Sequence, residues 1–433
     1  FNAAVSCPDI DPGGRPLFAL VATMDWLSDV KSVNRDEALR RLIARTDAQL
    51  ARRIGDRGAT FRAKNVRFLG TLFGGLSIEG YGALLGTGDP SPPSGLLPSI
   101  YDDVHAVGLD KLLNGLAPDI LGELSVLDCL ADAGVEGHAA RTVRDLAWRW
   151  SASAYTAFVE RAASDHRDHP SLVDLLDVEH IDAMPAWTSL LVGVIPLLRH
   201  SDHPAVAWIL ERLEEARTAD VAGTLDEPVA TARFWLATLV LHEGDAQRAN
   251  ALYSDVVATS DPSWYAHTHA LNNRGATWQT LGRNDLARAD YTAVIDSGVA
   301  TDEIRAMSYN NRADTYDDEG DATGAIADRT AVLELSDTSF NRRYIALIRR
   351  ARVLRTTGNQ AGADTDVEAI LTTDDIVIEQ KMAACLERAK WRIAEGSLQE
   401  AKLDLDAVIA SNRNFEAVEA EAGRLMLEIG GDH

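Results

Sequence analysis

Residues 271–291 read LNNRGATWQTLGRNDLARADY, and residues 309–329 repeat this pattern 38 positions later as YNNRADTYDDEGDATGAIADR. In both stretches two helical patterns flank a glycine. The spacing continues through five copies, in which a glycine, an alanine five residues after it and an apolar residue further on stay in register. The three columns are Gly244, Gly282, Gly320, Gly358 and Gly396; Ala249, Ala287, Ala325, Ala363 and Ala401; and Val256, Val294, Val332, Ile370 and Val408. The sequence therefore predicts a repeated helix-turn-helix unit.

Each copy is expected to form two packed helices. The first helix carries small and apolar residues three or four positions apart, as at Leu271, Gly275 and Trp278. The glycine ends this helix in the left-handed conformation, and the alanine lets the second helix cross closely. Because one helix pair cannot bury its apolar face alone, consecutive pairs must stack and share a continuous core.

The repeats also resemble a known family. The residues that carry the resemblance are Asn272, Asn273, Arg274, Gly275, Trp278, Gly282, Ala287 and Tyr291. Their pattern is similar to the tetratricopeptide repeat family over about 229–428. This resemblance implies an all-α, right-handed superhelical solenoid of helix pairs whose concave face binds proteins or peptides. The family repeat has about 34 residues, so these copies are longer by about four.

Two columns depart from the family pattern together. An arginine stands where the first helix usually has leucine, and an aspartate stands where the second helix usually has an aromatic residue. The columns are Arg274, Arg312, Arg350 and Arg388, and Asp290, Asp328, Asp366 and Asp404. We expect Arg–Asp pairs between helices, because a charged pair near the core must be well hydrogen-bonded to be tolerated.

A weaker periodicity lies upstream of the array. The segments 166–170 (HRDHP) and 200–204 (HSDHP) share one pattern and lie 34 residues apart. We expect them to be turns of degenerate repeats, with the proline in a first helical turn. The alternative is metal binding by the His-x-x-His pairs, which would need a third ligand and suits a helix face better. The predicted parts are thus a small helical or winged-helix-like domain at 1–136, degenerate repeats at 137–228 and the regular array at 229–433.

The segment 1–136 contains no repeat, but two short stretches resemble another class. Residues 14–20 (GRPLFAL) and 116–123 (LAPDILGE) are similar to sequences that follow the ATPase core of bacterial STAND-type signal-transduction ATPases. The resemblance implies a nucleotide site completed by residues before Phe1. The chain has no Gly-Lys pair and therefore no P-loop, so we expect any ATPase activity, and any oligomerisation through an ATPase domain, to lie before Phe1.

Composition narrows the choice of partners. The formal net charge of −24 disfavours nucleic acid, which calls for a basic surface. No apolar run approaches the roughly 18 residues of a membrane span. The three cysteines are far apart, which suits a reducing compartment. We therefore expect a cytoplasmic protein without a membrane, nucleic-acid, metal or cofactor site.

A group of polar residues on the first helices is the candidate partner-binding surface. Three arginines in the helix 342–355 recur every third residue, so an acidic peptide or a terminal carboxylate could bind there. The alternative is that these arginines neutralise acids of the preceding repeat. The candidate residues are Asn272, Gln279, Asn310, Asp314, Asp317, Arg349, Arg352 and Arg355.

The sequence thus predicts a protein-binding module and not an enzyme, with no catalytic residue assigned. The leading interpretation is the ligand-sensing, regulatory half of a STAND-type ATPase. A free-standing scaffold without a nucleotide-dependent role is the alternative. An enzyme with its site near residues 60–130 is the third possibility.

Overall fold

The computed structural model describes residues 40, 43–44, 119–132, 135–178, 184–410 and 416–430, and every regular element in these ranges is helical. The prediction of an all-α fold is therefore confirmed. The chain divides into two compact units between Leu239 and Val240, inside helix α12 (Asp226–His242). The three predicted domain boundaries stay a prediction. The segment 14–20, almost all of the predicted domain 1–136, and most of the alternative enzyme site near 60–130 lie outside the described residues.

Unit 1 contains short and medium helices around one apolar core. These helices are α6 (Asp119–Leu130), α7 (Val135–Trp150), α8 (Ala152–Asp165), α9 (Leu172–Leu176), α10 (Met184–Val194), the 3-10 turn η1 (Ile195–Leu197), α11 (Pro204–Ala219) and most of α12. Tyr155 and Trp187 are buried in the core, and the Tyr155 hydroxyl donates to the Leu175 carbonyl at 2.7 Å. The buried hydroxyl therefore has the acceptor that its burial requires.

Unit 2 consists of helix pairs that match the copies found in the sequence. After α13 (Ala246–Thr259) they are α14 (Tyr265–Thr280) with α15 (Asn284–Asp296), α16 (Asp302–Glu319) with α17 (Ala322–Glu334), α18 (Phe340–Thr356) with α19 (Gln360–Thr372), and α20 (Ile378–Ala394) with α21 (Leu398–Ala410). We call these pairs repeats 2 to 5. Helix α22 (Glu416–Gly430) packs on repeat 5.

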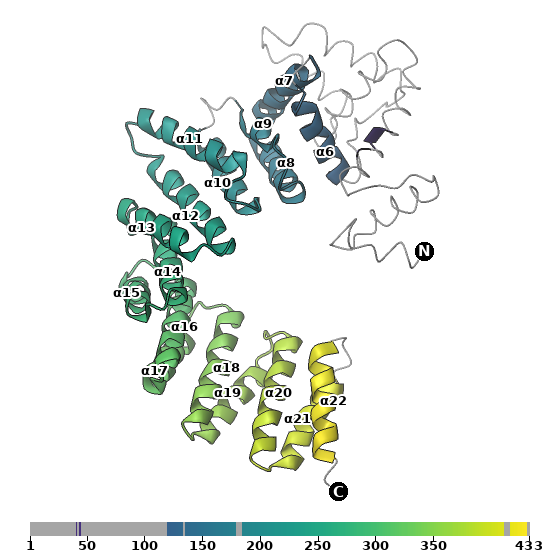
Figure 1. Cartoon of the computed structure of the whole chain (residues 1–433), viewed down its shortest axis with the longest axis vertical. Helices are drawn as coiled ribbons and strands as arrows, with labels where there is room; N and C mark the ends of the chain where they lie inside the picture. The colour runs from purple at the N-terminus through teal and green to yellow at the C-terminus, as the bar shows by residue number, and fades with distance from the viewer. Residues whose placement is uncertain are drawn as a thin grey trace. The chain divides into compact units, whose positions relative to one another are not determined.

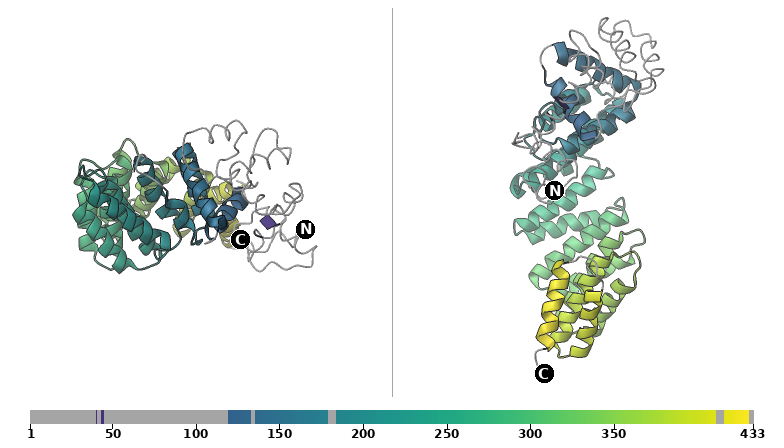
Figure 2. Two further views of the ribbon diagram at one scale, coloured as in Figure 1. Left: turned by 90° about the horizontal axis from the view of Figure 1, so that it is seen from above. Right: turned by 90° about the vertical axis from the view of Figure 1, so that its right-hand side faces the viewer.

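The helices of unit 2 form two layers (Figure 1). Each second helix packs against the first helix of its own repeat and against the first helix of the next. The first helices also contact one another, as α14 does with α16 and α16 with α18. The right-hand view of Figure 2 shows these pairs following one another toward α22. The predicted solenoid of helix pairs is therefore present in this unit.

The glycine, alanine and apolar columns of the sequence explain why the helix pairs repeat so regularly. The five glycines of the period all have positive φ, for example 73° at Gly282 and 78° at Gly320. At Gly320 the backbone N–H groups of residues 320 and 321 return to the last turn of α16, and the Asp321 side chain then accepts from the Gly324 N–H at 3.0 Å to begin α17. The alanine column and the apolar column are fully buried. Each column therefore fixes either the turn or the helix crossing.

We expect Gly320→Ala to lower the free energy of unfolding by about 1 kcal/mol, because alanine is strained at a positive φ. Gly423 is the matched control, since it lies inside α22 with open space around its Cα. Gly423→Ala should instead raise the free energy of unfolding by about 0.5–1 kcal/mol. Urea unfolding followed by circular dichroism measures both. Changes of the same sign in the two variants would contradict this account of the turn.

Candidate protein-binding surface

The arginine and aspartate columns meet in every repeat from 2 to 5. In repeat 3, Arg312 donates from Nε to Asp328 Oδ2 at 2.8 Å and from Nη2 to Oδ1 at 2.7 Å. The same two-bond geometry joins Arg274 to Asp290, Arg350 to Asp366 and Arg388 to Asp404. The hydrogen bonds to Asp328 raise the pKa of Arg312. These pairs connect the two helices of one repeat.

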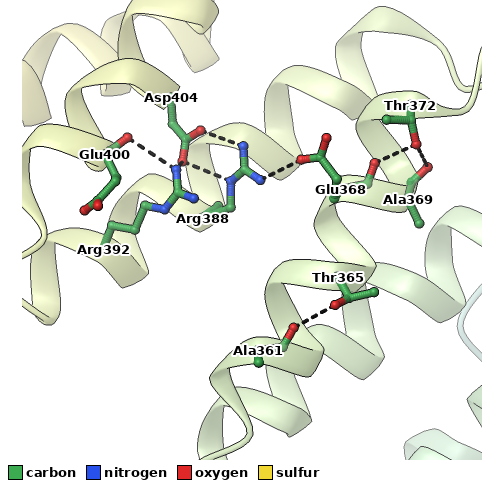
Figure 3. A network of polar contacts seen from close by, with 9 residues as sticks. All are labelled: Ala361, Thr365, Glu368, Ala369, Thr372, Arg388, Arg392, Glu400 and Asp404. Atoms are coloured by element: carbon green, nitrogen blue, oxygen red, sulfur yellow. Dashed lines mark hydrogen bonds and ion pairs between the residues drawn. The ribbon is translucent and has the colours of Figure 1, made fainter.

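The same arginines also reach the preceding repeat. Nη1 of Arg312 donates to the Thr292 hydroxyl at 2.7 Å, and Nη1 of Arg350 donates to the Thr330 hydroxyl at 2.8 Å. Figure 3 shows the last case, in which Arg388 lies between Asp404 and Glu368. Each guanidinium therefore holds three helices together. Because these side chains are occupied in the packing, we assign them to the architecture and not to partner binding.

We expect Asp328→Ala to lower the free energy of unfolding by roughly 3 kcal/mol, because it leaves a largely buried guanidinium without its counter-ion. The double variant Arg312→Met, Asp328→Leu removes both charges and should recover most of that loss. Urea unfolding of the whole chain measures both. The exposed Asp406 supplies the surface control, Asp406→Ala. An equal effect of Asp328→Ala and Asp406→Ala would show that the pair does not stabilise the array.

A line of charged pairs runs across the exposed side of the first helices. Arg349 on α18 pairs with Asp314 on α16, and Arg352 Nη2 lies 3.3 Å from Glu387 Oε1 on α20. Lys390 Nζ on α20 lies 3.4 Å from Glu421 Oε1 on α22. We call these six residues the first-helix ladder. Their side chains are partly exposed, with 42% for Arg349 and 53% for Arg352, so a partner can reach them.

Six of the eight predicted contact residues have side chains that are not buried. Gln279, Asp314, Asp317, Arg349 and Arg352 lie on or beside this accessible side. Gln279 Nε2 donates to Asp318 Oδ2 at 3.0 Å across the helices. Arg355 pairs with Glu395 of the following repeat, and its guanidinium lies 5.4 Å from the centre of the Trp391 ring.

Two of the predicted contacts need correction. Asn272 and Asn310 are only 2% and 3% exposed, so neither is available to a partner. Asn272 Oδ1 accepts from the Ser308 hydroxyl and from Asn311 Nδ2, each at 3.1 Å. Asn310 Nδ2 donates to the Arg342 carbonyl at 3.3 Å. Both asparagines lie between neighbouring first helices.

The alternative was that the three arginines of α18 neutralise acids of the preceding repeat, and this holds for Arg349 alone. Arg349 pairs backward with Asp314, whereas Arg352 and Arg355 pair forward with Glu387 and Glu395. The sequence reasoning missed these forward partners. A search for opposite charges 35 positions apart would have found both Asp314–Arg349 and Arg352–Glu387.

The sequence reasoning also missed a buried arginine below the ladder. Arg329 on α17 is fully buried, and its Nη2 donates to Asp314 Oδ1 at 2.9 Å and to Asp317. It stands in the column that holds Tyr253 and Tyr291 in the two preceding copies. Asp314 thus carries Arg329 on its inner side and Arg349 on its outer side. This arrangement fixes the two carboxylates on the surface of α16.

Unit 1 contains a cavity of about 460 Å³ beside the first His-x-x-His segment. His169 Nδ1 accepts from the Ser171 N–H at 3.2 Å, and His203 Nδ1 accepts from the Ala205 N–H at 3.0 Å in the second segment. Both segments are therefore turns, and Pro204 begins α11 as predicted. Pro170 lies in the turn before α9. Among the described residues, no group of three or more His, Cys, Asp or Glu side chains could hold a metal ion.

Asp128 is a carboxylate of this cavity that two side chains hold in place. Burial raises its pKa, but hydrogen bonds from His169 and Arg40 outweigh burial and lower the pKa to about 2. The distances are 3.3 Å to His169 Nε2 and 2.9 Å to each of two Arg40 nitrogens. The carboxylate therefore stays ionised at neutral pH and serves as a structural acceptor.

Comparisons with known proteins give helical-repeat structures. No family model and no curated protein matches the chain. A solved tetratricopeptide repeat protein from Parabacteroides merdae is 16% identical, covers 64% of this chain and 93% of its own, and has a TM-score of 0.36. A monomeric mutant of IFIT1 with Gppp-AAAA is 11% identical, covers 77% of this chain and 72% of its own, and has a TM-score of 0.36. The chain's own helix pairs define unit 2 as an all-α solenoid. None of the described helices is long and apolar enough to cross a membrane.

Proposed function

We propose that unit 2 is a protein-binding module whose partner lies along the first-helix ladder. The observation that carries the proposal is the ladder itself, because it places partly exposed charges of both signs on one line across α16, α18, α20 and α22. Stacked repeats create extended surfaces of this kind, on which a partner contacts several repeats at once.

The architecture favours binding with little rearrangement. Each first helix is held to two second helices by its partly buried arginine, as Arg350 is by Asp366 and Thr330. The neighbouring ladder residues therefore lie on a rigid helix. A surface that is ordered before binding loses less conformational entropy when the partner docks.

The partner class follows from charge. The net charge of −24 opposes nucleic acid, since phosphate binding requires a basic surface. A protein or peptide segment satisfies the mixed charges of the ladder better. The ladder sites offer hydrogen-bond donors and acceptors at fixed spacing, which suits side-chain recognition along an extended segment.

A narrower form of the proposal is the ligand-sensing half of a bacterial, cytoplasmic STAND-type ATPase. Two short stretches, 14–20 and 116–123, carry the resemblance to these ATPases. The first stretch lies outside the described residues, as does the first part of the second. The free-standing scaffold is the other form. Both forms use the same first-helix surface, so the experiment below tests what they share.

Arg352→Glu should abolish partner capture, because it reverses one charge of the ladder opposite Glu387. The charge swap Arg352→Glu, Glu387→Arg should restore the ion pair and any lost stability without restoring capture. Lys402→Glu is the matched control, since Lys402 is exposed on the second helix α21. Capture is measured by quantitative mass spectrometry of the proteins bound to the immobilised chain, and stability is measured by urea unfolding. Undiminished capture by both Arg352 variants would place the binding surface elsewhere.

A further inference from the structure

Helix α20 begins at an apolar residue where the two preceding first helices begin at a polar cap. Thr301 and Ser339 accept backbone N–H groups of α16 and α18 through their hydroxyl groups, and the residue 38 positions after Ser339 is Val377. Valine offers no acceptor, so α20 has no side-chain cap at its start. Val377 is 59% exposed, so packing inside the chain does not explain its presence at this position.

Two further exposed apolar side chains lie on the same and the adjoining helix turn. Ile378 follows Val377 directly, and Phe340 holds the position equivalent to Ile378 one repeat earlier. Gln380 Nε2 donates to Asn341 Oδ1 at 3.0 Å, which holds the first turns of α18 and α20 beside each other. Single exposed apolar residues are ordinary, but a group on adjoining turns marks a contact surface. We call Phe340, Val377 and Ile378 the apolar patch.

The part of the patch on α18 is fixed to the preceding repeat. Glu303 of α16 accepts from the Ser339 N–H at 2.9 Å, from the Ser339 hydroxyl at 3.1 Å and from Arg342 Nε at 3.0 Å. Ser339 and Arg342 stand on either side of Phe340 in the sequence, so these bonds hold the turn that carries the Phe340 ring. A side chain that docks there meets a surface that is ordered before binding.

The apolar patch continues into the first-helix ladder. The i+4 row of α18 that begins at Phe340 also contains Tyr344 and Arg352. Burial raises the pKa of the half-buried Tyr344, and the charges of Arg352 and Glu387 act on the same hydroxyl. The row is about 18 Å long, because each residue of a helix rises about 1.5 Å. An extended segment held at Arg352 and Glu387 therefore reaches the patch within about five or six residues.

Charge beside the patch favours a basic segment over a second copy of this chain. Asp374, Asp375 and Glu379 are exposed and lie within three residues of Val377. The chain carries a net charge of −24, so two copies that met at this patch would bring like charges together. A segment with lysine or arginine next to an apolar residue places opposite charges against these carboxylates.

We infer that the apolar patch binds an aliphatic or aromatic side chain of the protein partner, in a basic segment that continues to the ladder pair Arg352–Glu387. The inference rests on the proposed function and names the chemistry of the partner. Docking removes from water the apolar surface that the free chain leaves exposed. It also explains the missing cap, because a hydroxyl group at position 377 would lose its water beneath the docked side chain.

The test is a display library of random short peptides, selected on the whole chain and sequenced before and after binding. We expect bound peptides to be enriched in an aliphatic or aromatic residue with lysine or arginine next to it. The double variant Val377→Thr, Ile378→Thr makes the patch polar without changing its charge, and it gives α20 the cap residue that α16 has. It should weaken binding of the selected peptides roughly tenfold, while the urea midpoint of the chain should not fall.

The matched control is Leu403→Thr, because Leu403 is an exposed apolar residue of the second helix α21 and Thr365 is its equivalent one repeat earlier. This variant should leave the affinity for the selected peptides unchanged. Equal weakening by Leu403→Thr and by the double variant would reduce the effect to general apolar attraction and overturn the inference. Phe340→Ser changes the patch from α18 and should weaken the same peptides, so the result does not depend on the start of α20 alone.

The remaining outcomes separate this inference from the proposed function. Selected peptides that lack the apolar residue, or that are weakened by Arg352→Glu but not by the patch variants, would overturn the inference and keep the ladder as the binding surface. Self-association in analytical ultracentrifugation that is lost in the double variant would assign the patch to a second copy of the chain. Selection of no peptide would overturn the inference, and the proposed function falls with it only if both Arg352 variants also capture proteins undiminished.

Discussion

The array depends on the guanidinium groups that lie between its two layers. An arginine has five N–H donors in a rigid fork and cannot lose its charge in a protein, so burying it requires acceptors on several sides. In repeat 3 these acceptors are Asp328 within the repeat and Thr292 in the preceding one. Apolar contacts alone would tolerate small slips between helices. The paired arginine tolerates them less, because a slip breaks directional hydrogen bonds and leaves a charge desolvated.

Neighbouring residues on one helix separate architecture from recognition. Arg350 faces the second helices and is held by Asp366 and Thr330, whereas Arg349, one residue earlier, is 42% exposed and pairs with Asp314. Successive residues of a helix point about 100° apart, so the two guanidinium groups cannot share an environment. The chemistry of the surface can therefore change at position 349 without loss of the core pairing at 350.

The sequence predicts the features that recur and misses those that occur once. Gly320, Ala325 and the pair Arg312–Asp328 could be found because each belongs to a column with a fixed physical role. Arg329 could not, since its column holds tyrosine in the copies before it and no periodic pattern marks the position. The burial of Asn310 was missed for a related reason. Periodicity gives the side of the helix, but the closeness of the next helix decides whether that side is exposed.

Departures from the repeat therefore carry the most information about how one junction differs from the next. A residue that follows its column is explained by packing, as Asn272 is by Ser308 and Asn311. At the next junction Ala346 and Arg349 replace these donors, and a buried acceptor is left unpaired. Packing alone gives no reason for this cost, because another asparagine at 349 could repeat the earlier arrangement. The same repeat also holds Arg329, whose Nε and Nη1 have no hydrogen-bond partner among the described residues, so the departures from the columns leave both donors and an acceptor unpaired.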